Sequence, residues 1–180
     1  DLGMEEARFE VRIDPLTEPG QNGMDRVEFM LSANPGESLK PLEKVASGGE
    51  MSRIMLAFKA IAANADSIPT LIFDEIDTGI SGHIAAVVGE KMVSIADNHQ
   101  VLCVTHLPQI AALADVHFMV QKQDDGQTTR TSLKRLEMEE RYEYIARMMS
   151  GMEDSKLAYE HARELITHSE EIKQKRRKNK

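Results

Sequence analysis

Cysteines and long apolar runs are scarce in this sequence, and each absence excludes a class of protein. Cys103 is the one cysteine among 180 residues, so neither an internal disulfide nor a cysteine-based zinc site can form. No apolar run reaches the roughly 18 to 20 residues that span a bilayer. Residues 1–10 also lack the basic and apolar regions of a secretory signal. We therefore expect a cytoplasmic protein without a membrane partner.

Basic residues are scarce as well, except at the C-terminal end. The chain has 22 Lys and Arg against 30 Asp and Glu, a net charge of −8, and six of the basic residues lie in residues 173–180. The other 16 basic residues leave residues 1–172 with a net charge of −14. Because an acidic body repels a nucleic-acid backbone, DNA contact requires the tail, a local patch or protein outside this sequence. The tail is interpreted either as a solvated helix end, which we favour, or as a DNA-contacting arm.

Apolar residues make up 41% of the chain, enough for a packed core, and some of them alternate with polar ones. Alternation is typical of strands. Residues 9–13 and 27–31 are predicted to pair as an antiparallel hairpin, with a loop over residues 15–24. A second hairpin is predicted for residues 118–121 and 129–136, because the segment between them contains Asp124, Asp125 and Gly126.

Elsewhere the apolar residues recur at spacings of three and four, which predicts helices. These helices are expected near residues 50–65, 84–95, 108–114, 142–149 and 155–172, and Gly151 is predicted to stop the fourth of them. The expected buried face of the first helix is Met51, Ile54, Met55, Phe58, Ile61, Ala62 and Ala65. For the last helix, capped by Asp154 or Ser155, the expected face is Leu157, His161, Leu165 and Ile172.

Two short runs, residues 68–73 and 100–104, are apolar on both faces and predict buried parallel strands. Helices that alternate with such strands define an α/β fold, here with parallel central strands flanked by helices and with antiparallel hairpin additions.

A glycine pair precedes the first of these helices, in the string Ser47, Gly48, Gly49 and Glu50. Glycines let a ligand approach the backbone closely, and the free N–H groups and dipole of a helix N-terminus attract anions. An anion site is therefore one interpretation of this string. The alternative is an ordinary helix cap, with Ser47 as the cap and Glu50 as the matching acid.

Polar side chains follow both predicted central strands. Asp74 and Glu75 come directly after the first strand, and His106 follows the second. Ligands of open α/β sheets bind beyond the carboxyl ends of the strands. In a nucleotide site the first carboxylate can hold Mg²⁺, the second can orient an attacking water, and the histidine can bind a phosphate oxygen. The alternatives are two solvated acids in a polar loop and a structural histidine.

The order of these features resembles the C-terminal half of an ABC-type ATPase head. It contains a signature motif at residues 47–50, a Walker B strand at 71–75, a D-loop near Asp77 and a switch histidine, His106. Three finer strings are similar to the RecN family, bacterial SMC-like proteins of DNA double-strand-break repair: VASGGEMSR at residues 45–53, DEIDTGISG at 74–82 and THLPQIAA at 105–112. The resemblance spans residues 7–166, although Ala46 stands where many ABC signatures have leucine.

A P-loop is absent from the sequence, so the Walker A half of the site is missing. The resemblance implies the C-terminal lobe of a P-loop (ABC/SMC-like) ATPase head. Residues 1–7 would end a coiled-coil helix, residues 8–166 would form the head lobe, and residues 167–180 would be a helix end and basic tail.

The resemblance also implies cofactors and roles. The implied cofactors are ATP and Mg²⁺. Asp74 would hold the metal through a water, and Glu75 would polarise the attacking water. His106 would contact the γ-phosphate in cis, and Ser47, Gly48, Gly49 and Glu50 would bind ATP of a partner head in trans. Asp77 would lie in the loop that couples the two sites.

The implied partners are the N-terminal Walker A half, a second head, and DNA through the full-length protein. We expect the chain alone to be inactive as an ATPase, because the P-loop lysine and amides are absent. Two alternatives stay open: the head lobe of another SMC-like or ABC-type ATPase, and a nucleotide-insensitive dimerisation module.

Overall fold

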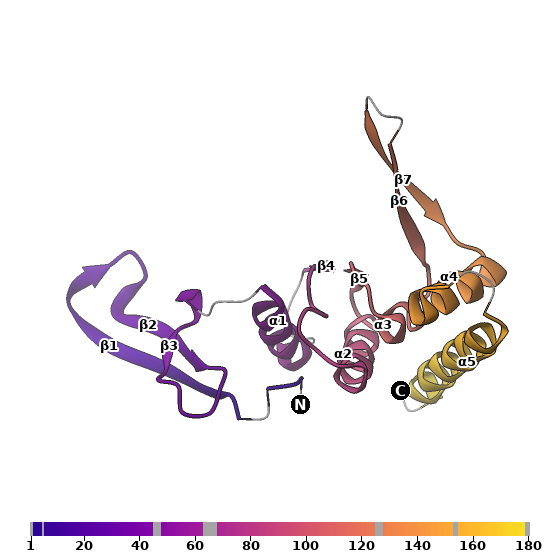
Figure 1. Cartoon of the computed structure of the whole chain (residues 1–180). Coiled ribbons are helices and arrows are strands. Elements are labelled where there is room, and N and C mark those ends of the chain that lie inside the picture. The colour runs from indigo at the N-terminus through magenta and orange to yellow at the C-terminus, as the bar shows by residue number, and fades with distance from the viewer. Residues whose placement is uncertain are drawn as a thin grey trace.

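A computed structural model of the chain describes residues 2–4, 6–44, 48–62, 68–124, 128–152 and 155–178. It begins with an antiparallel sheet that projects to one side of the molecule (Figure 1). This sheet contains β1 (Arg8–Gly20), β2 (Gly23–Ser32) and the short β3 (Lys40–Pro41), in that order across the sheet. A single 3-10 turn, Leu42–Lys44, follows. The predicted first hairpin is confirmed, with Phe9 opposite Leu31 and Val11 opposite Phe29.

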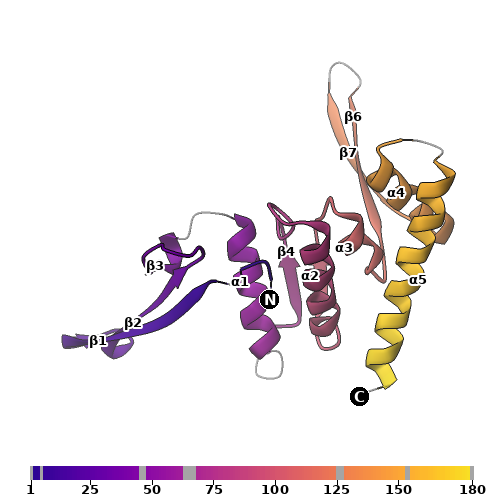
Figure 2. The same ribbon diagram turned by 60° about the horizontal axis from the view of Figure 1, so that its bottom comes forward.

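The centre of the molecule is a parallel strand pair with helices packed on one side (Figures 1 and 2). The elements in chain order are α1 (Gly48–Ala62), β4 (Thr70–Phe73), α2 (Gly82–Ile95), β5 (Gln100–Cys103) and α3 (Pro108–Ala112). β4 and β5 pair in parallel from Thr70 opposite Gln100 to Phe73 opposite Cys103. The predicted parallel strands are therefore confirmed, and with them the α/β fold.

The C-terminal part contains a second projecting hairpin and two helices. β6 (Phe118–Asp124) pairs antiparallel with β7 (Thr129–Arg135), as predicted. α4 (Met138–Ser150) ends at Gly151, whose φ of 66° is the left-handed conformation that glycine adopts at low cost. α5 (Lys156–Lys178) packs beside α4, and its first turn is capped by the Ser155 hydroxyl. The prediction that Gly151 stops one helix and Ser155 starts the next is confirmed.

Two clusters of buried side chains hold these elements together. The first joins the N-terminal residues, α1, β4, α2 and α3, and it contains Leu2, Leu56, Leu71, Phe73, Ile76, Ala85, Val88, Met92, Ile95 and Ile110. The second joins α3, α4 and α5 and contains Ala111, Ala112, Ile145, Ala146, Ala162 and Ile166. Because α3 contributes to both clusters, it links the parallel strand pair to the C-terminal helices.

The predicted loop over residues 15–24 is wrong. β1 continues to Gly20 and β2 starts at Gly23, with a two-residue turn between them. The register shifts between Pro15 and Gly20. β1 is the edge strand of its sheet, the kind of strand in which proline is tolerated. The proline and glycine that suggested a loop therefore lie within an irregular edge strand.

The predicted burial of β4 and β5 on both faces is also wrong for this chain. Leu71 and Phe73 are buried at 8% and 5% exposure, but Ile72 is 72% exposed and Leu102, opposite it, is 45% exposed. Helices α1 and α2 cover one face of the pair, and no described residue buries the other. The apolar residues that predicted a two-sided core therefore form one covered face and one bare face.

The predicted faces of the first and last helices need correction, although both helices are present. In α1 the buried residues include Arg53 and Leu56, whereas Ile61 is 85% exposed. In α5 Leu157 is 79% exposed, and the helix buries Ala162, Ile166, Ser169 and Lys173 instead. Each helix turns toward its tertiary neighbours a face that contains polar residues, which apolar spacing alone does not identify. Ala65 of the predicted first face, and Asp154, lie outside the described residues.

The N-terminal end of the chain also differs from expectation. Residues 2–4 and 6–7, expected to end a coiled-coil helix, are not helical: Leu2 is in the core, and Gly3, with a φ of 76°, lies against Ile84. At the other end, residues 167–178 of the expected helix end and basic tail are the last part of α5.

The basic tail is partly anchored to the body. Lys173 is 5% exposed and pairs with Asp115 at 3.0 Å and Glu170 at 2.9 Å. Arg176 donates hydrogen bonds to Ser94 Oγ and to Asp97 Oδ2, at 2.8 and 3.2 Å. For these two residues the interpretation as a solvated helix end is wrong. Within the described ranges, no helix is long and apolar enough to cross a membrane.

Candidate nucleotide site

The carboxyl ends of β4 and β5 bring the predicted site residues to one edge of the strand pair. Asp74 and Glu75 follow Phe73, the last residue of β4, and His106 comes three residues after the end of β5. The two segments stay hydrogen-bonded just beyond the strands, because the backbone N–H of Val104 donates to Phe73 O at 3.0 Å. The prediction that Asp74, Glu75 and His106 emerge at the same edge of the sheet agrees with this placement.

The glycine pair at the start of α1 packs directly against the segment after β4. A Cβ at Gly48 would lie 2.6 Å from Glu75 Oε2, and a Cβ at Gly49 would lie 3.0 Å from the carbonyl oxygens of Glu75 and Thr78. No side chain fits at either distance without a shift of its neighbours. Glu75 itself has a φ of 56°, a left-handed conformation uncommon outside glycine. The helix N-terminus and the carboxylate of Glu75 are therefore adjacent, as expected for an acid near the positive end of a helix dipole.

Ser47, predicted to belong to the same anion site, lies outside the described residues. Glu50 is in the first turn of α1 and half-buried. Of the four residues in the predicted string, the structure thus brings Gly48 and Gly49 to Glu75.

Two residues of α1 that sequence reasoning missed bind the backbone of residues 74–78. Ser52 Oγ donates to Asp74 O at 2.9 Å. Arg53 Nη1 donates to Thr78 O at 3.0 Å and, more weakly, to Ile76 O at 3.4 Å. Burial lowers the pKa of the Arg53 guanidinium, and the charge of Glu50 partly offsets this, but an arginine remains charged at neutral pH. Their polarity excluded both residues from an apolar face, so no signal in the spacing could have found them.

Asp77 lies under the other side of the site. Its side chain is 3% exposed, and Oδ2 accepts hydrogen bonds from Thr105 Oγ1 at 2.5 Å and from the His106 backbone N–H at 2.8 Å. The imidazole Nδ1 of His106 lies 3.1 Å from the same oxygen. Burial opposes ionisation of Asp77, but the bonds from Thr105 and His106 outweigh it, so the pKa of this carboxyl is below its ordinary value. Asp77 is therefore a buried carboxylate that binds the end of β5.

Asp74 provides the oxygen chemistry that Mg²⁺ prefers, but as a single exposed carboxylate. Among the described residues, no group of three or more His, Cys, Asp or Glu side chains could hold a metal ion. Magnesium in nucleotide sites is commonly bound by one or two carboxylates together with substrate phosphates and water. Asp74 fits a metal that arrives with a nucleotide and does not fit a metal held by protein ligands alone.

Cys103, beneath the site at the end of β5, is not a nucleophile. Burial, followed by the charges of Asp77 and Asp74, raises the pKa of its thiol to about 12. The thiol therefore stays protonated at neutral pH and packs as a small apolar group.

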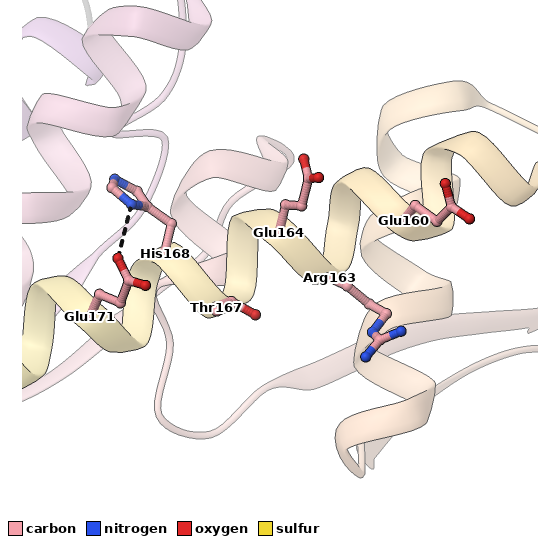
Figure 3. Close-up of a pocket in the computed structure, with 6 residues that line it drawn as sticks. All are labelled: Glu160, Arg163, Glu164, Thr167, His168 and Glu171. Atoms are coloured by element: carbon pink, nitrogen blue, oxygen red, sulfur yellow. Dashed lines mark ion pairs between the residues drawn. The ribbon is translucent and has the colours of Figure 1, made fainter.

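A shallow hollow lies far from this edge, on one side of α5 (Figure 3). It is lined by Glu160, Arg163, Glu164, Thr167, His168 and Glu171, and His168 pairs with Glu171 at 3.9 Å. All six residues come from a single helix and leave the hollow open to solvent. It brings together none of the predicted site residues.

The arrangement of these elements is the fold of solved SMC heads. A structure from work on ATP-driven dimerization and DNA-stimulated activation of SMC ATPases aligns with 82% of this chain and 84% of its own, with a TM-score of 0.50 and 20% identity. The Smc head domain of Pyrococcus furiosus, solved with an extended coiled coil and bound to the C-terminal domain of ScpA, aligns with 76% of this chain and 32% of its own, with a TM-score of 0.52 and 22% identity. Identities this low establish the fold alone.

Sequence relatives identify the family, although no family model matches the chain. The DNA repair protein RecN of Halalkalibacterium halodurans is 48% identical over 176 residues, which are 96% of this chain and 31% of that protein. RecN of Deinococcus radiodurans is 49% identical over 166 residues, 92% of this chain and 29% of that protein. RecN of Bacillus subtilis is 46% identical over 154 residues, 85% and 27% of the two chains. The chain belongs to the RecN family, and it spans about a third of the length of these relatives.

Proposed function

We propose that this chain is part of an ATP-hydrolysing head of an SMC-like protein that acts in DNA double-strand-break repair and recombination. The family relationship and the head fold support this proposal. The observation that carries it is the edge at which β4 and β5 end, where Asp74, Glu75 and His106 emerge and where Glu75 lies against the N-terminus of α1.

At that edge each residue has a role suited to phosphoryl transfer. Asp74 would hold Mg²⁺ together with the phosphates of a bound nucleotide, and the metal would neutralise charge on the β- and γ-phosphates. Glu75 would accept a hydrogen bond from the attacking water and polarise it. His106, whose side chain is 71% exposed, would contact the γ-phosphate in cis. Asp77 would keep the loop that joins the two halves of a composite site in place.

The signature residues would act on a second head. Ser47, Gly48, Gly49 and Glu50 would bind the γ-phosphate of ATP held by the partner head, through the free N–H groups of a helix N-terminus. Two heads would then be bridged by ATP and released by its hydrolysis. The phosphate-binding Walker A half would come from the N-terminal part of the full-length protein.

The full-length protein would bind DNA at breaks, in the cytoplasm and in association with the nucleoid. Lys173 and Arg176 are paired with acidic or hydroxyl groups of the body, so a basic tail that contacts DNA would rely on its other basic residues. Of these, Lys175, Arg177 and Lys178 are exposed.

The test is a mixing experiment with the separately produced N-terminal, P-loop-bearing half. We expect Mg²⁺-dependent ATP hydrolysis in the mixture and none from this chain alone, because the P-loop lysine and amides are missing. Glu75→Gln should abolish hydrolysis while ATP still joins the heads. A stable complex of the two halves that does not hydrolyse ATP would contradict the proposed function and favour a nucleotide-insensitive dimerisation module.

A further inference from the structure

Asp77 makes contacts that the sequence motifs do not account for. It is 3% exposed, although it lies in the segment between β4 and α2 that is otherwise at the edge of the sheet. A buried carboxylate requires hydrogen-bond partners, and here Thr105 and His106, just after β5, supply them. The side chain of Asp77 therefore joins the segment after one central strand to the segment after the other.

The contacts on this carboxylate form a small network. Thr105 Oγ1 donates to Asp77 Oδ2 and accepts a hydrogen bond from the Leu107 backbone N–H at 3.0 Å. The His106 backbone N–H donates to the same carboxylate oxygen. Residues 105–107 are thus fixed immediately before α3 begins at Pro108. This fixes the backbone that carries the imidazole of His106.

The ring of His106 has one neighbouring carboxylate among the residues that the structure describes. Its Nδ1 lies 3.1 Å from Asp77 Oδ2, while the side chain as a whole is 71% exposed. An ionised carboxylate oxygen can only accept, so it favours a proton on the ring nitrogen that faces it. A neutral ring with its proton on Nδ1 has Nε2 as the free nitrogen, on the side away from Asp77.

We propose that Asp77 is a positioning residue for His106: its carboxylate fixes the backbone of residues 105–107 and keeps a proton on Nδ1, so that Nε2 is the ring nitrogen presented to the ligand. Nε2 without a proton accepts a hydrogen bond, so the ligand is a donor: the water beside the γ-phosphate of a nucleoside triphosphate, through which His106 would reach that phosphate. This inference rests on the proposed function for the identity of the ligand. The hydrogen-bond network and the ring orientation rest on the structure.

The first test is the protonation pattern of the His106 ring in the full-length protein. Long-range ¹H–¹⁵N correlation spectra of histidine-labelled protein report which ring nitrogen carries the proton, and His106→Gln identifies the signal. We expect the Nδ1–H form in the wild-type protein and a shift toward the Nε2–H form in Asp77→Asn. An Nε2–H ring in the original protein would overturn the proposal without the need for any variant.

Thr105→Val is the matched control, because it removes one bond to Asp77 and leaves both the carboxylate and the ring. It should keep the Nδ1–H form. The same loss of this form in Thr105→Val and Asp77→Asn would mean that the loop rearranges in both variants, and it would overturn the role of the Asp77 charge.

The second test is steady-state ATP hydrolysis by the full-length protein. Asp77→Asn should lower kcat by roughly tenfold or more and change the KM for ATP by less than about twofold, because the ring is misdirected and binding is not lost. An unchanged kcat in a variant whose His106 ring has moved its proton to Nε2 would overturn the proposal. If the original protein does not hydrolyse ATP, the proposed function fails, and the ring measurement still decides the role of Asp77.

Discussion

The two faces of the β4–β5 pair have almost the same composition and opposite environments. Leu71 and Phe73 point to the side covered by α1 and α2 and are 8% and 5% exposed. Ile72 and Leu102 point to the other side and are 72% and 45% exposed. Val104, just beyond β5, is 61% exposed. Two strands that are apolar on both faces belong to a core with layers on both sides. The bare face is therefore the side on which further protein is expected to pack.

The β6–β7 hairpin repeats this contrast on a smaller scale. Met119 is 8% exposed, whereas Phe118 and Val120, its neighbours in the strand, are 49% and 56% exposed. Val120 lies opposite Leu133, which is 66% exposed. In both places one face packs against other elements of the chain, and no described residue covers the other face.

The largest effect on stability should come from removing a buried side chain from the covered face. Phe73→Ala removes a buried aromatic ring and leaves a cavity between β4 and the helices, and we expect a loss of about 3 to 5 kcal/mol in the free energy of unfolding. Ile72→Ala, one residue away on the bare face, should change it by no more than about 0.5 kcal/mol. Urea unfolding of the isolated chain measures both. Equal losses would mean that the two faces are not different in solution.

The next effect concerns the helix that covers the sheet. Arg53→Met keeps the length of the side chain but leaves the carbonyl oxygens of Thr78 and Ile76 without their donor. Buried acceptors that lose a donor cost about 1 to 3 kcal/mol, and we expect a loss of this size. Arg12→Met, on the exposed surface of β1, is the matched control and should lie within about 0.5 kcal/mol of the original chain. A neutral Arg53→Met would show that these bonds do not hold α1 in place.

A smaller, pH-dependent effect is expected beside Met119 on the covered face of the second hairpin. Burial, and then the charge of Arg141, lower the pKa of His117. The unfolded chain therefore binds a proton first as the pH falls below about 6.5, and the contribution of His117 to stability is lost as the pH falls further through its folded pKa. His117→Phe should flatten the fall in unfolding free energy between about pH 7 and pH 5.

The same two proteins at pH 8, where the imidazole is neutral in both states, separate the loss of packing from the effect of the proton. A fall between pH 7 and pH 5 that is as steep in His117→Phe as in the original chain would contradict the assignment.

The smallest effect on stability, and a visible one on assembly, is expected from the bare face. Ile72→Ser together with Leu102→Ser removes apolar surface that is already in contact with water, so the free energy of unfolding should change by less than about 1 kcal/mol. We expect the isolated chain to self-associate through such surfaces and the double variant to do so less. Sedimentation velocity at several concentrations measures this. Unchanged association would place the contact elsewhere, for example on the β6–β7 hairpin.

Much of the fold could be predicted because the signals are local. Alternation at residues 9–13 and 27–31 predicted the first hairpin, and Gly151 predicted the end of α4. The two apolar runs and the acids and histidine after them predicted both the parallel pair and the edge at which Asp74, Glu75 and His106 emerge. These features depend on the spacing of residue types within a few turns or strands, which is visible in the chain itself.

Other features could not be predicted because they depend on what a segment meets. Arg53 is polar and buried because Thr78 and Ile76, more than twenty positions later, offer it carbonyl oxygens. Lys173 is buried because Asp115 lies beside α5. Apolar spacing assigns such residues to the solvent-facing side of a helix, and only the tertiary partner reverses the assignment.

The sequence by itself determined the order of the elements and the parallel strand pair, because these depend on residue types and their spacing over short segments. It also determined the family to which the chain belongs, because family motifs are short strings of residues. Only the tertiary structure decided which face of the β4–β5 pair is covered. It also decided that Asp77 binds the end of β5, and that Gly48 and Gly49 lie against Glu75. These contacts join segments that are about thirty positions apart in the chain, and a long-range contact is set by how the layers pack.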